Sequence, residues 1–198
     1  WGSHVAKDLE YLKQQGYQFS GFVTDGGTGV TKAVQKVFPH RPHQICLVHV
    51  HREAGRGLGK YPQSYQLQKL KRLVDHLFLI ESKEALKWWT NEVLEWAQVN
   101  KEYLQEVTHD PIRRKWWYTH KKVRRTVRIL LSAPETSFVF VKGHPLIPRS
   151  TNEVEGINAL LTRRFRTHTG LADHRWKQFI SWCIYFRNLY YASKLKRK

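Results

Sequence analysis

Apolar positions in the first 60 residues alternate between helical spacing and short continuous runs. Helical spacing over 4–16 ends at a glycine and predicts an amphipathic helix. An apolar run at 19–24 ends in Asp-Gly-Gly, which is typical of a buried strand entering a tight turn, and helical spacing returns over 30–37. The run at 44–50 (QICLVHV) predicts a second buried strand. Helix, strand, helix and strand in this order predict that residues 1–60 form the first part of an α/β core.

The spacing further along the chain is that of longer helices. Residues 61–133 are therefore predicted to form an all-helical insertion. A proline-containing stretch with a short β-like run at 138–141 then leads back to the core. We assign residues 134–198 to the second part of the core, with one helix that starts near Ser150 and a final aromatic-rich helix over 171–193. The predicted fold is α/β but dominated by helices.

The charge narrows the range of functions. The chain has 34 Lys and Arg against 16 Asp and Glu, a net charge of +18, and a pI near 10.1. A protein with such an excess of positive charge usually binds a polyanion, most often nucleic acid. No apolar run approaches the roughly 18 residues of a membrane span, and the first residues lack the order of a signal peptide. Two cysteines give no disulfide framework, so we expect a cytoplasmic protein without membrane contact.

The positive charge is concentrated in one half of the predicted insertion. Residues 81–106 hold six Glu, whereas residues 111–131 hold eight Lys and Arg and no acid. We expect this basic segment to contact DNA phosphates, and a solvated basic face is the alternative. Trp116 and Trp117 are candidates to stack on or wedge between bases, with core packing expected for at least one of them. The candidate DNA-binding residues are Arg113, Arg114, Lys115, Lys121, Lys122, Arg124 and Arg125, together with Arg163, Arg164 and Arg166.

Asp25 stands where the first predicted strand meets the glycine turn. A carboxylate on such a rigid support can hold a divalent cation. Asp-Gly is also a very common turn sequence, so a purely structural role is the alternative. The glycines that follow lack the order of a dinucleotide-binding loop and the Lys-Ser/Thr of a P-loop, so no nucleotide site is predicted.

Two glutamates compete for a role at the predicted helix near residue 150. Ser150-x-x-Glu153 matches a capping box, which gives Glu153 a structural task. Glu155 has no such task, and at helical spacing it shares a polar stripe with Asn158 beside the apolar stripe of the helix. This spacing places Glu155 on a partly buried flank at the edge of the core. An ordinary solvated glutamate is the alternative.

Histidines surround Cys46 between residues 40 and 51. One Cys with several His is a possible zinc site, but on a strand Cys46 and His49 point to opposite faces, so no zinc is expected. We instead expect His49 at the end of the strand near Asp25. No Ser or Cys nucleophile motif is present, and Cys183 is expected to be a buried, inert thiol.

These motifs together resemble the Mutator-related DDE transposases of bacterial insertion sequences. The resemblance spans nearly the whole chain and begins with the strand and Asp-Gly turn of VTDGGTGVTKAV (23–34). Phe38-Pro39 and Gln44-x-Cys46-x-x-His49 follow, and then the predicted insertion. The most specific stretch is PRSTNEVEGINALLTRRFRTHTGL-x-x-HR (148–175), which is similar to the sequence around the catalytic glutamate of that family.

The resemblance implies a ribonuclease H-like fold in which three carboxylates hold two divalent cations, Mg²⁺ or Mn²⁺. By motif position, Asp25 would be the second carboxylate and Glu155 the third. Cys46, His49 and Asn158 would lie near the active site. The implied partners are the terminal inverted repeats of a transposon and target DNA, bound by a homodimer or a higher assembly in the nucleoid.

The chain departs from the family pattern in one respect. The family's first catalytic Asp stands on a strand well upstream of the second, and Asp8 lies in a predicted helix, where we interpret it as a surface charge. The expectation is therefore an incomplete ribonuclease H-like core that lacks its N-terminal strands, in an N-terminally truncated transposase. The alternative is a non-catalytic basic DNA-binding protein or an inactive transposase remnant.

Overall fold

The structure, a computed structural model, describes residues 2–168 and 170–195. The chain divides into two units, residues 1–151 and residues 152–198. Helices dominate both units, and the strands form two small sheets of two strands each within the described residues. The prediction of a helix-dominated α/β chain is therefore confirmed, whereas the three-part division at residues 60 and 133 stays a prediction.

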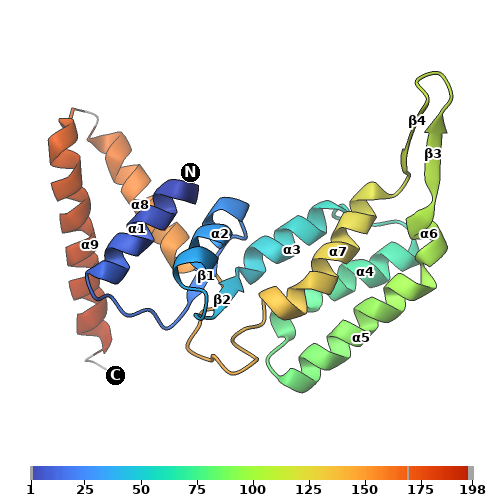
Figure 1. Cartoon of the computed structure of the whole chain (residues 1–198), viewed down its shortest axis with the longest axis horizontal. Coiled ribbons are helices and arrows are strands. Elements are labelled where there is room, and N and C mark those ends of the chain that lie inside the picture. The colour runs from blue at the N-terminus through green and yellow to red at the C-terminus, as the bar shows by residue number, and fades with distance from the viewer. Residues whose placement is uncertain (1, 169, 196–198) are drawn as a thin grey trace. The chain divides into compact units, whose positions relative to one another are not determined.

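The first unit opens with the predicted helix, strand, helix and strand: α1 (Gly2–Gln14), β1 (Phe22–Thr24), α2 (Thr28–Val37) and β2 (His43–Ile45). The two strands pair in parallel, with Phe22 opposite His43. Helices α1 and α2 lie side by side and bury Ala6, Ala33 and Val37 between them (Figure 1). This α/β element fixes the direction in which the chain leaves β1, where Asp25 stands.

The second predicted strand is wrong beyond Ile45. A helix, α3 (Leu47–Arg56), begins directly after Cys46. A short apolar run fits a buried strand and a buried helix equally well. Helix is favoured here because Leu47, Val50 and Ala54 recur at steps of three and four and are all buried on one face.

Further helices cover α3 and build the main core of the unit: α4 (Tyr65–Asp75), the short 3₁₀ helix η1 (His76–Leu79), α5 (Lys83–Val99), α6 (Lys101–Gln105) and α7 (Lys121–Thr136). The serines that precede α4 and α5 cap them by accepting backbone N–H bonds. Trp89 and Trp96 are buried in this core, and their indole N–H groups donate to the carbonyls of Leu73 (2.8 Å) and Gln66 (2.9 Å). The aromatic content therefore supplies much of the packing.

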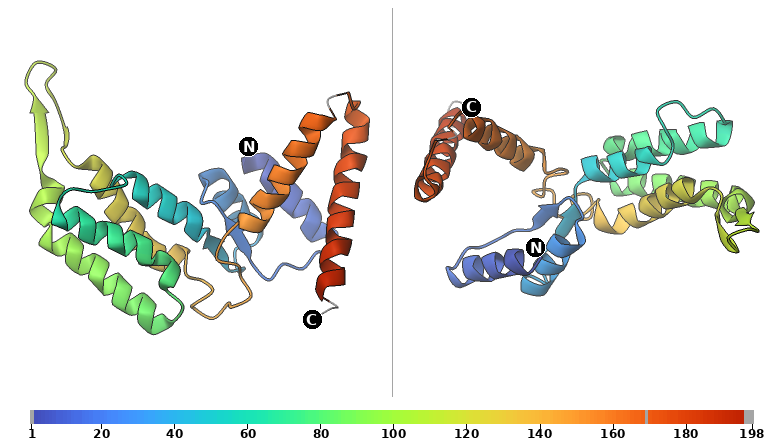
Figure 2. Two further views of the ribbon diagram at one scale, coloured as in Figure 1. Left: turned by 180° about the vertical axis from the view of Figure 1, so that it is seen from behind. Right: turned by 90° about the horizontal axis from the view of Figure 1, so that it is seen from above.

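The prediction that residues 61–133 are all-helical is wrong, because a β-hairpin separates α6 from α7. Strands β3 (Val107–Asp110) and β4 (Lys115–Tyr118) pair antiparallel, and the hairpin extends away from the helices (Figures 1 and 2). The Asp110 carboxylate accepts the backbone N–H groups of Ile112 and Arg113 at 3.1 Å, which shapes the turn. The predicted β-like run at 138–141 is also wrong, since these residues form turns in which Phe138 is buried in the core.

The second unit consists of two helices, α8 (Asn152–Thr167) and α9 (Asp173–Leu195). Both were predicted: α8 begins two residues after its predicted start, and α9 agrees with the predicted range 171–193 to within two residues at each end. Phe165 of α8 packs edge-on against Trp176 of α9, with ring centroids 4.5 Å apart. Cys183 is buried, as expected, whereas several aromatic side chains of α9, including Trp182 and Phe186, are exposed.

Candidate active site and nucleic-acid interface

Asp25 follows the last residue of β1 and begins a tight turn. Its Oδ1 accepts the backbone N–H of Gly27 at 2.9 Å, and Gly26 has a φ of 86°, which favours glycine. The turn is anchored by the buried Thr24, whose hydroxyl contacts His43 Nε2 at 2.9 Å. Burial lowers the pKa of His43, so this imidazole is neutral near pH 7. The Asp25 carboxylate is thus exposed on a rigid support.

An open cleft of about 370 Å³ lies beside Asp25, between α3 and α7. His49 and Glu53 of α3 line one side, and Arg125 and Arg128 of α7 line another. Glu53 forms an ion pair with Arg125 at 2.6 Å, and a second one with Arg56. The cleft therefore places two carboxylates, an imidazole and two guanidinium groups around one opening.

Cys46 and His49 lie on the same turn, contrary to the prediction that they point to opposite faces. Cys46 is the residue directly before α3 and His49 is in its first turn, so a helix rather than a strand sets their geometry. Burial raises the pKa of the Cys46 thiol, but hydrogen bonding from His49 and Thr151 outweighs this effect and lowers the pKa to about 7.

The sequence did not indicate the structural role of Gln44. Its side chain forms hydrogen bonds with three backbone groups that are far away in the sequence. It is fully buried on β2, and its Oε1 accepts the N–H groups of Val139 (3.0 Å) and Phe140 (3.4 Å). Its Nε2 donates to the Arg149 carbonyl, which also accepts the N–H of Leu47 at 2.9 Å. A polar residue inside an apolar run is the only sequence signal for this role. Gln44 and Cys46 together fix the segment that leads to α8.

Glu155 and Asn158 lie on α8 in the second unit, whereas Asp25 belongs to the first. Glu155, Asn158 and Thr162 are exposed, so the predicted partly buried flank is wrong. The helix begins at Asn152, two residues after the predicted cap Ser150. Among residues 2–168 and 170–195, no three His, Cys, Asp or Glu side chains are grouped so that they could hold a metal ion.

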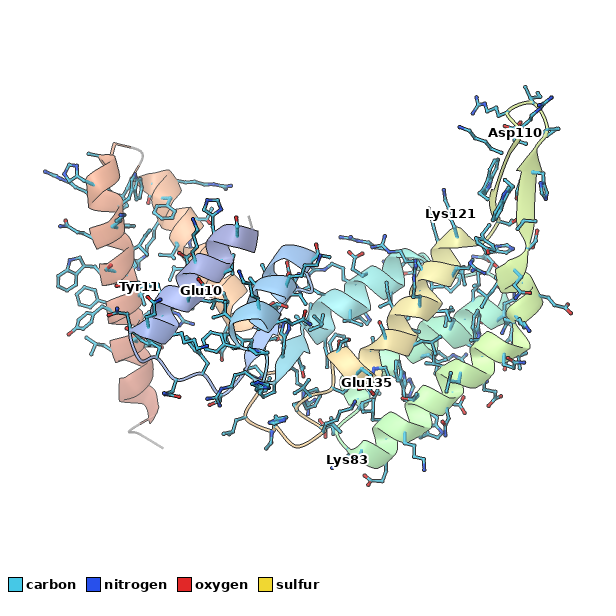
Figure 3. The ribbon with its side chains drawn as sticks, viewed as in Figure 1. Glu10, Tyr11, Lys83, Asp110, Lys121 and Glu135 are labelled. Atoms are coloured by element: carbon cyan, nitrogen blue, oxygen red, sulfur yellow. The ribbon has the colours of Figure 1, made fainter. Side chains whose placement is uncertain are left out.

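The predicted DNA-binding residues of the insertion follow the hairpin and α7. Lys121 and Lys122 open α7 at the base of the hairpin and are exposed, and Figure 3 shows Lys121 there and Asp110 near the tip. Arg124 is different, because its guanidinium lies over the Tyr118 ring, 3.6 Å from the centroid, and donates to the Leu104 carbonyl. No ion pair within the described residues engages Arg114, Lys115, Lys121, Lys122 or Arg128.

Neither tryptophan of the hairpin is part of the core, contrary to the expectation for at least one of them. Trp116 is 59% exposed and Trp117 43% exposed. Antiparallel pairing places His109 opposite Trp116 and Thr108 opposite Trp117, so the two indoles lie on opposite faces of the hairpin. On α8 of the second unit, Arg163, Arg164 and Arg166 are exposed, and an Arg164 nitrogen lies 3.6 Å from Cys183 Sγ.

The family model "Transposase, Mutator family" matches residues 6–109, more than half of the chain. The chain therefore belongs to the Mutator family of transposases. Comparisons with curated proteins and with solved structures found no match. Within the described residues, every helix is too short or too polar to cross a membrane.

Proposed function

We propose that this chain is part of a DDE-type transposase that cleaves DNA strands at transposon ends and transfers them to target DNA. The observation that carries the proposal is the position of Asp25: an exposed carboxylate on a tight turn after a parallel strand, beside a cleft with Arg125 and Arg128 on its wall. Membership of the Mutator transposase family supports the same conclusion. In this proposal β1, α2 and β2 belong to a ribonuclease H-like core.

Asp25 and Glu155 are the proposed carboxylate ligands of Mg²⁺ or Mn²⁺. Both cations prefer carboxylate oxygens, so the donor chemistry of these residues fits. Bound metal ions would stabilise the attacking and leaving oxygens of the phosphoryl transfer. The family pattern contains a first carboxylate besides these two, and we propose no residue of this chain for it. Cys46, His49 and Asn158 are proposed to position the site rather than to bind the metal.

The remaining residues of the cleft would orient the DNA. Arg128 would bind a phosphate that flanks the scissile bond, and Arg125 would do so on leaving its ion pair with Glu53. The exposed cations of the hairpin, of the start of α7 and of α8 would bind the phosphates of the double-stranded terminal repeat and the target. We further propose a homodimer or higher assembly on paired ends, acting on DNA in the nucleoid.

Cleavage by the complete transposase of which this chain is part tests the proposal. The substrate is a duplex that ends in the element's terminal repeat, in buffer with Mg²⁺ or Mn²⁺. Asp25→Asn and Glu155→Gln should each abolish metal-dependent cleavage and leave DNA affinity within about twofold of the wild type. Asp8→Asn and Glu153→Gln are matched controls, since both side chains are exposed on helices, and they should cleave normally.

Two results would contradict the proposal. Retained cleavage in Asp25→Asn or Glu155→Gln would remove that residue from the active site. DNA binding by the wild type without any metal-dependent cleavage would favour the alternative function, a non-catalytic DNA-binding protein or an inactive transposase remnant.

A further inference from the structure

One face of the β3–β4 hairpin carries an exposed aromatic surface. Trp116 and Tyr118 share this face, and their rings meet edge-on with centroids 5.6 Å apart. Trp117 lies on the opposite face. Ile112 at the turn is 93% exposed, between the acidic Asp110 and the basic pair Arg113 and Arg114. Large apolar side chains exposed on a narrow, basic hairpin indicate a binding site for a ligand that is itself partly apolar and negatively charged.

The same face continues into a groove at the base of the hairpin. The groove has a volume of about 520 Å³, and Tyr118, Lys121, Arg124 and Arg128 contribute to its lining. The rest of its lining is apolar, from Ala97, Leu104, Val127 and Leu131. Arg124 fixes the Tyr118 ring from one side by stacking on it and by donating to the Leu104 carbonyl. Trp116, Tyr118 and the apolar lining therefore form one continuous surface with cations beside it.

We propose that this surface, the Trp116 face of the hairpin together with the groove, holds a DNA nucleotide that has left the duplex. A base has two apolar faces that stack on aromatic rings, and its phosphate pairs with cations such as Lys121 and Arg128. The volume of the groove exceeds that of a single nucleobase, whereas the stacked bases of an intact duplex present only their edges to a protein. Binding to the DNA backbone alone would need the cations but not an exposed tryptophan.

The groove is also adjacent to the Asp25 cleft. Arg128 of α7 lines both, so a strand displaced from the duplex would pass directly from one to the other. The inference thus deepens the proposed transposase function, on which this last point rests: the hairpin would keep a base next to the cleavage site unpaired. The nucleotide-binding surface itself requires only DNA binding, so it can be tested without catalysis.

The test compares two duplexes that differ at one position. A single 2-aminopurine is paired in one duplex and unpaired in the other. Binding is followed by fluorescence anisotropy in EDTA, which excludes metal-dependent cleavage. The wild-type chain should bind the duplex with the unpaired base about tenfold more tightly, the effect of one stacking contact, and should quench 2-aminopurine fluorescence. Trp116→Ala should remove both the preference and the quenching.

Trp117→Ala is the matched control, since it removes the same side chain from the other face of the hairpin and should keep the preference. Lys121→Glu should weaken binding of the duplex with the unpaired base more than that of the paired duplex, because Lys121 pairs with the phosphate of the extruded nucleotide. Equal affinity of the wild type for the two duplexes would overturn the proposal, as would equal effects of Trp116→Ala and Trp117→Ala. Loss of a dimer in Trp116→Ala, without a change in the preference, would assign the surface to a second copy of the chain instead.

Discussion

The Cys46 sulfur accepts a hydrogen bond from the backbone N–H of Thr151 at 3.4 Å, although the two residues are 105 positions apart. Thr151 is the last residue of the first unit, directly before α8. The neighbouring backbone bond from Leu47 to the Arg149 carbonyl, at 2.9 Å, strengthens the same attachment. Cys46 and Leu47 therefore hold the segment from which the Glu155 helix begins.

Cys46→Ala should loosen this attachment. The substitution removes the sulfur acceptor and leaves a small cavity beside the start of α3, at a cost of about 1–2 kcal/mol in the free energy of unfolding. Amide hydrogen exchange at Thr151 should become faster than in the wild type. Cys183→Ala is the control, because it also removes a buried thiol but lies in the second unit, and it should leave this amide unchanged. Unchanged exchange in Cys46→Ala would contradict the attachment.

The same thiol gives the stability of the fold a pH dependence. Its pKa is about 7 in the folded chain against an ordinary value of 9.0, so the unfolded chain binds more protons between these values. The contribution of Cys46 to stability should therefore rise as the pH rises from about 7 to 9, and should be lost as the pH falls through 7. Urea unfolding of the wild type and Cys46→Ala measures it: the difference between them should be larger at pH 9 than at pH 6. Equal differences would show that the thiol is not ionised.

The sequence predicted those elements whose spacing has only one interpretation. Helices α1 and α2 have apolar residues at clear helical spacing, and β1 ends at a glycine turn. The apolar run at 44–50 fits both periods, and only the burial of Leu47, Val50 and Ala54 against later helices selects the helix. Once residues 47–56 are known to be helical, His49 and Glu53 are four positions apart and so share the helix face that lines the cleft.

The hairpin and the role of Gln44 were hidden for different reasons. Residues 111–117 are all exposed, so the segment lacks the alternation of buried apolar and exposed polar positions that indicates a strand. From its sequence, it could not be distinguished from a basic helix. Gln44 has partners 95, 96 and 105 positions away. No local pattern encodes contacts at such separations, because they depend on how the insertion folds.

Gln44→Leu should destabilise the first unit strongly. Leucine fills much of the same volume but leaves the N–H groups of Val139 and Phe140 and the Arg149 carbonyl without the side-chain partner, at a cost of about 2–4 kcal/mol. Circular dichroism during urea unfolding measures the loss. Gln63→Leu should change the stability by less than about 0.5 kcal/mol, because Gln63 is exposed and its side chain donates to the nearby Tyr61 carbonyl. Similar losses in both variants would show that burial of Gln44 contributes nothing specific.

Two glycines of the α3 region should respond in opposite directions to alanine. A Cβ at Gly57 would stand 2.3 Å from Thr126 Oγ1 and 2.7 Å from the Lys122 carbonyl, so Gly57→Ala would push α3 and α7 apart. We expect a loss of about 1–3 kcal/mol, with weaker packing of both helices that line the Asp25 cleft. A Cβ at Gly55 meets nothing within 4 Å, and Gly55→Ala should stabilise α3 by about 0.5–1 kcal/mol. Thermal unfolding compares them, and equal shifts would refute the close approach.

Lys122 and Arg125 should differ in their effect on DNA binding, although both are exposed on α7. No ion pair within the described residues engages Lys122, whereas Arg125 is held by Glu53 at 2.6 Å. Lys122→Ala should therefore reduce the slope of log affinity against log salt by about 1, the effect of one phosphate contact. Arg125→Ala should reduce it less, because Arg125 must leave Glu53 to reach a phosphate.

Glu53→Gln is the converse variant. It removes the charge that holds Arg125, so it should raise DNA affinity and make the salt dependence steeper. Anisotropy titrations with one duplex from about 50 to 300 mM salt measure all three variants. If Lys122→Ala and Arg125→Ala change the slope equally and Glu53→Gln has no effect, Glu53 does not restrain Arg125 and both cations contact phosphates alike. If Glu53→Gln strengthens binding as expected, the Asp25 cleft contains a carboxylate whose task is to limit contact with DNA at the α7 surface.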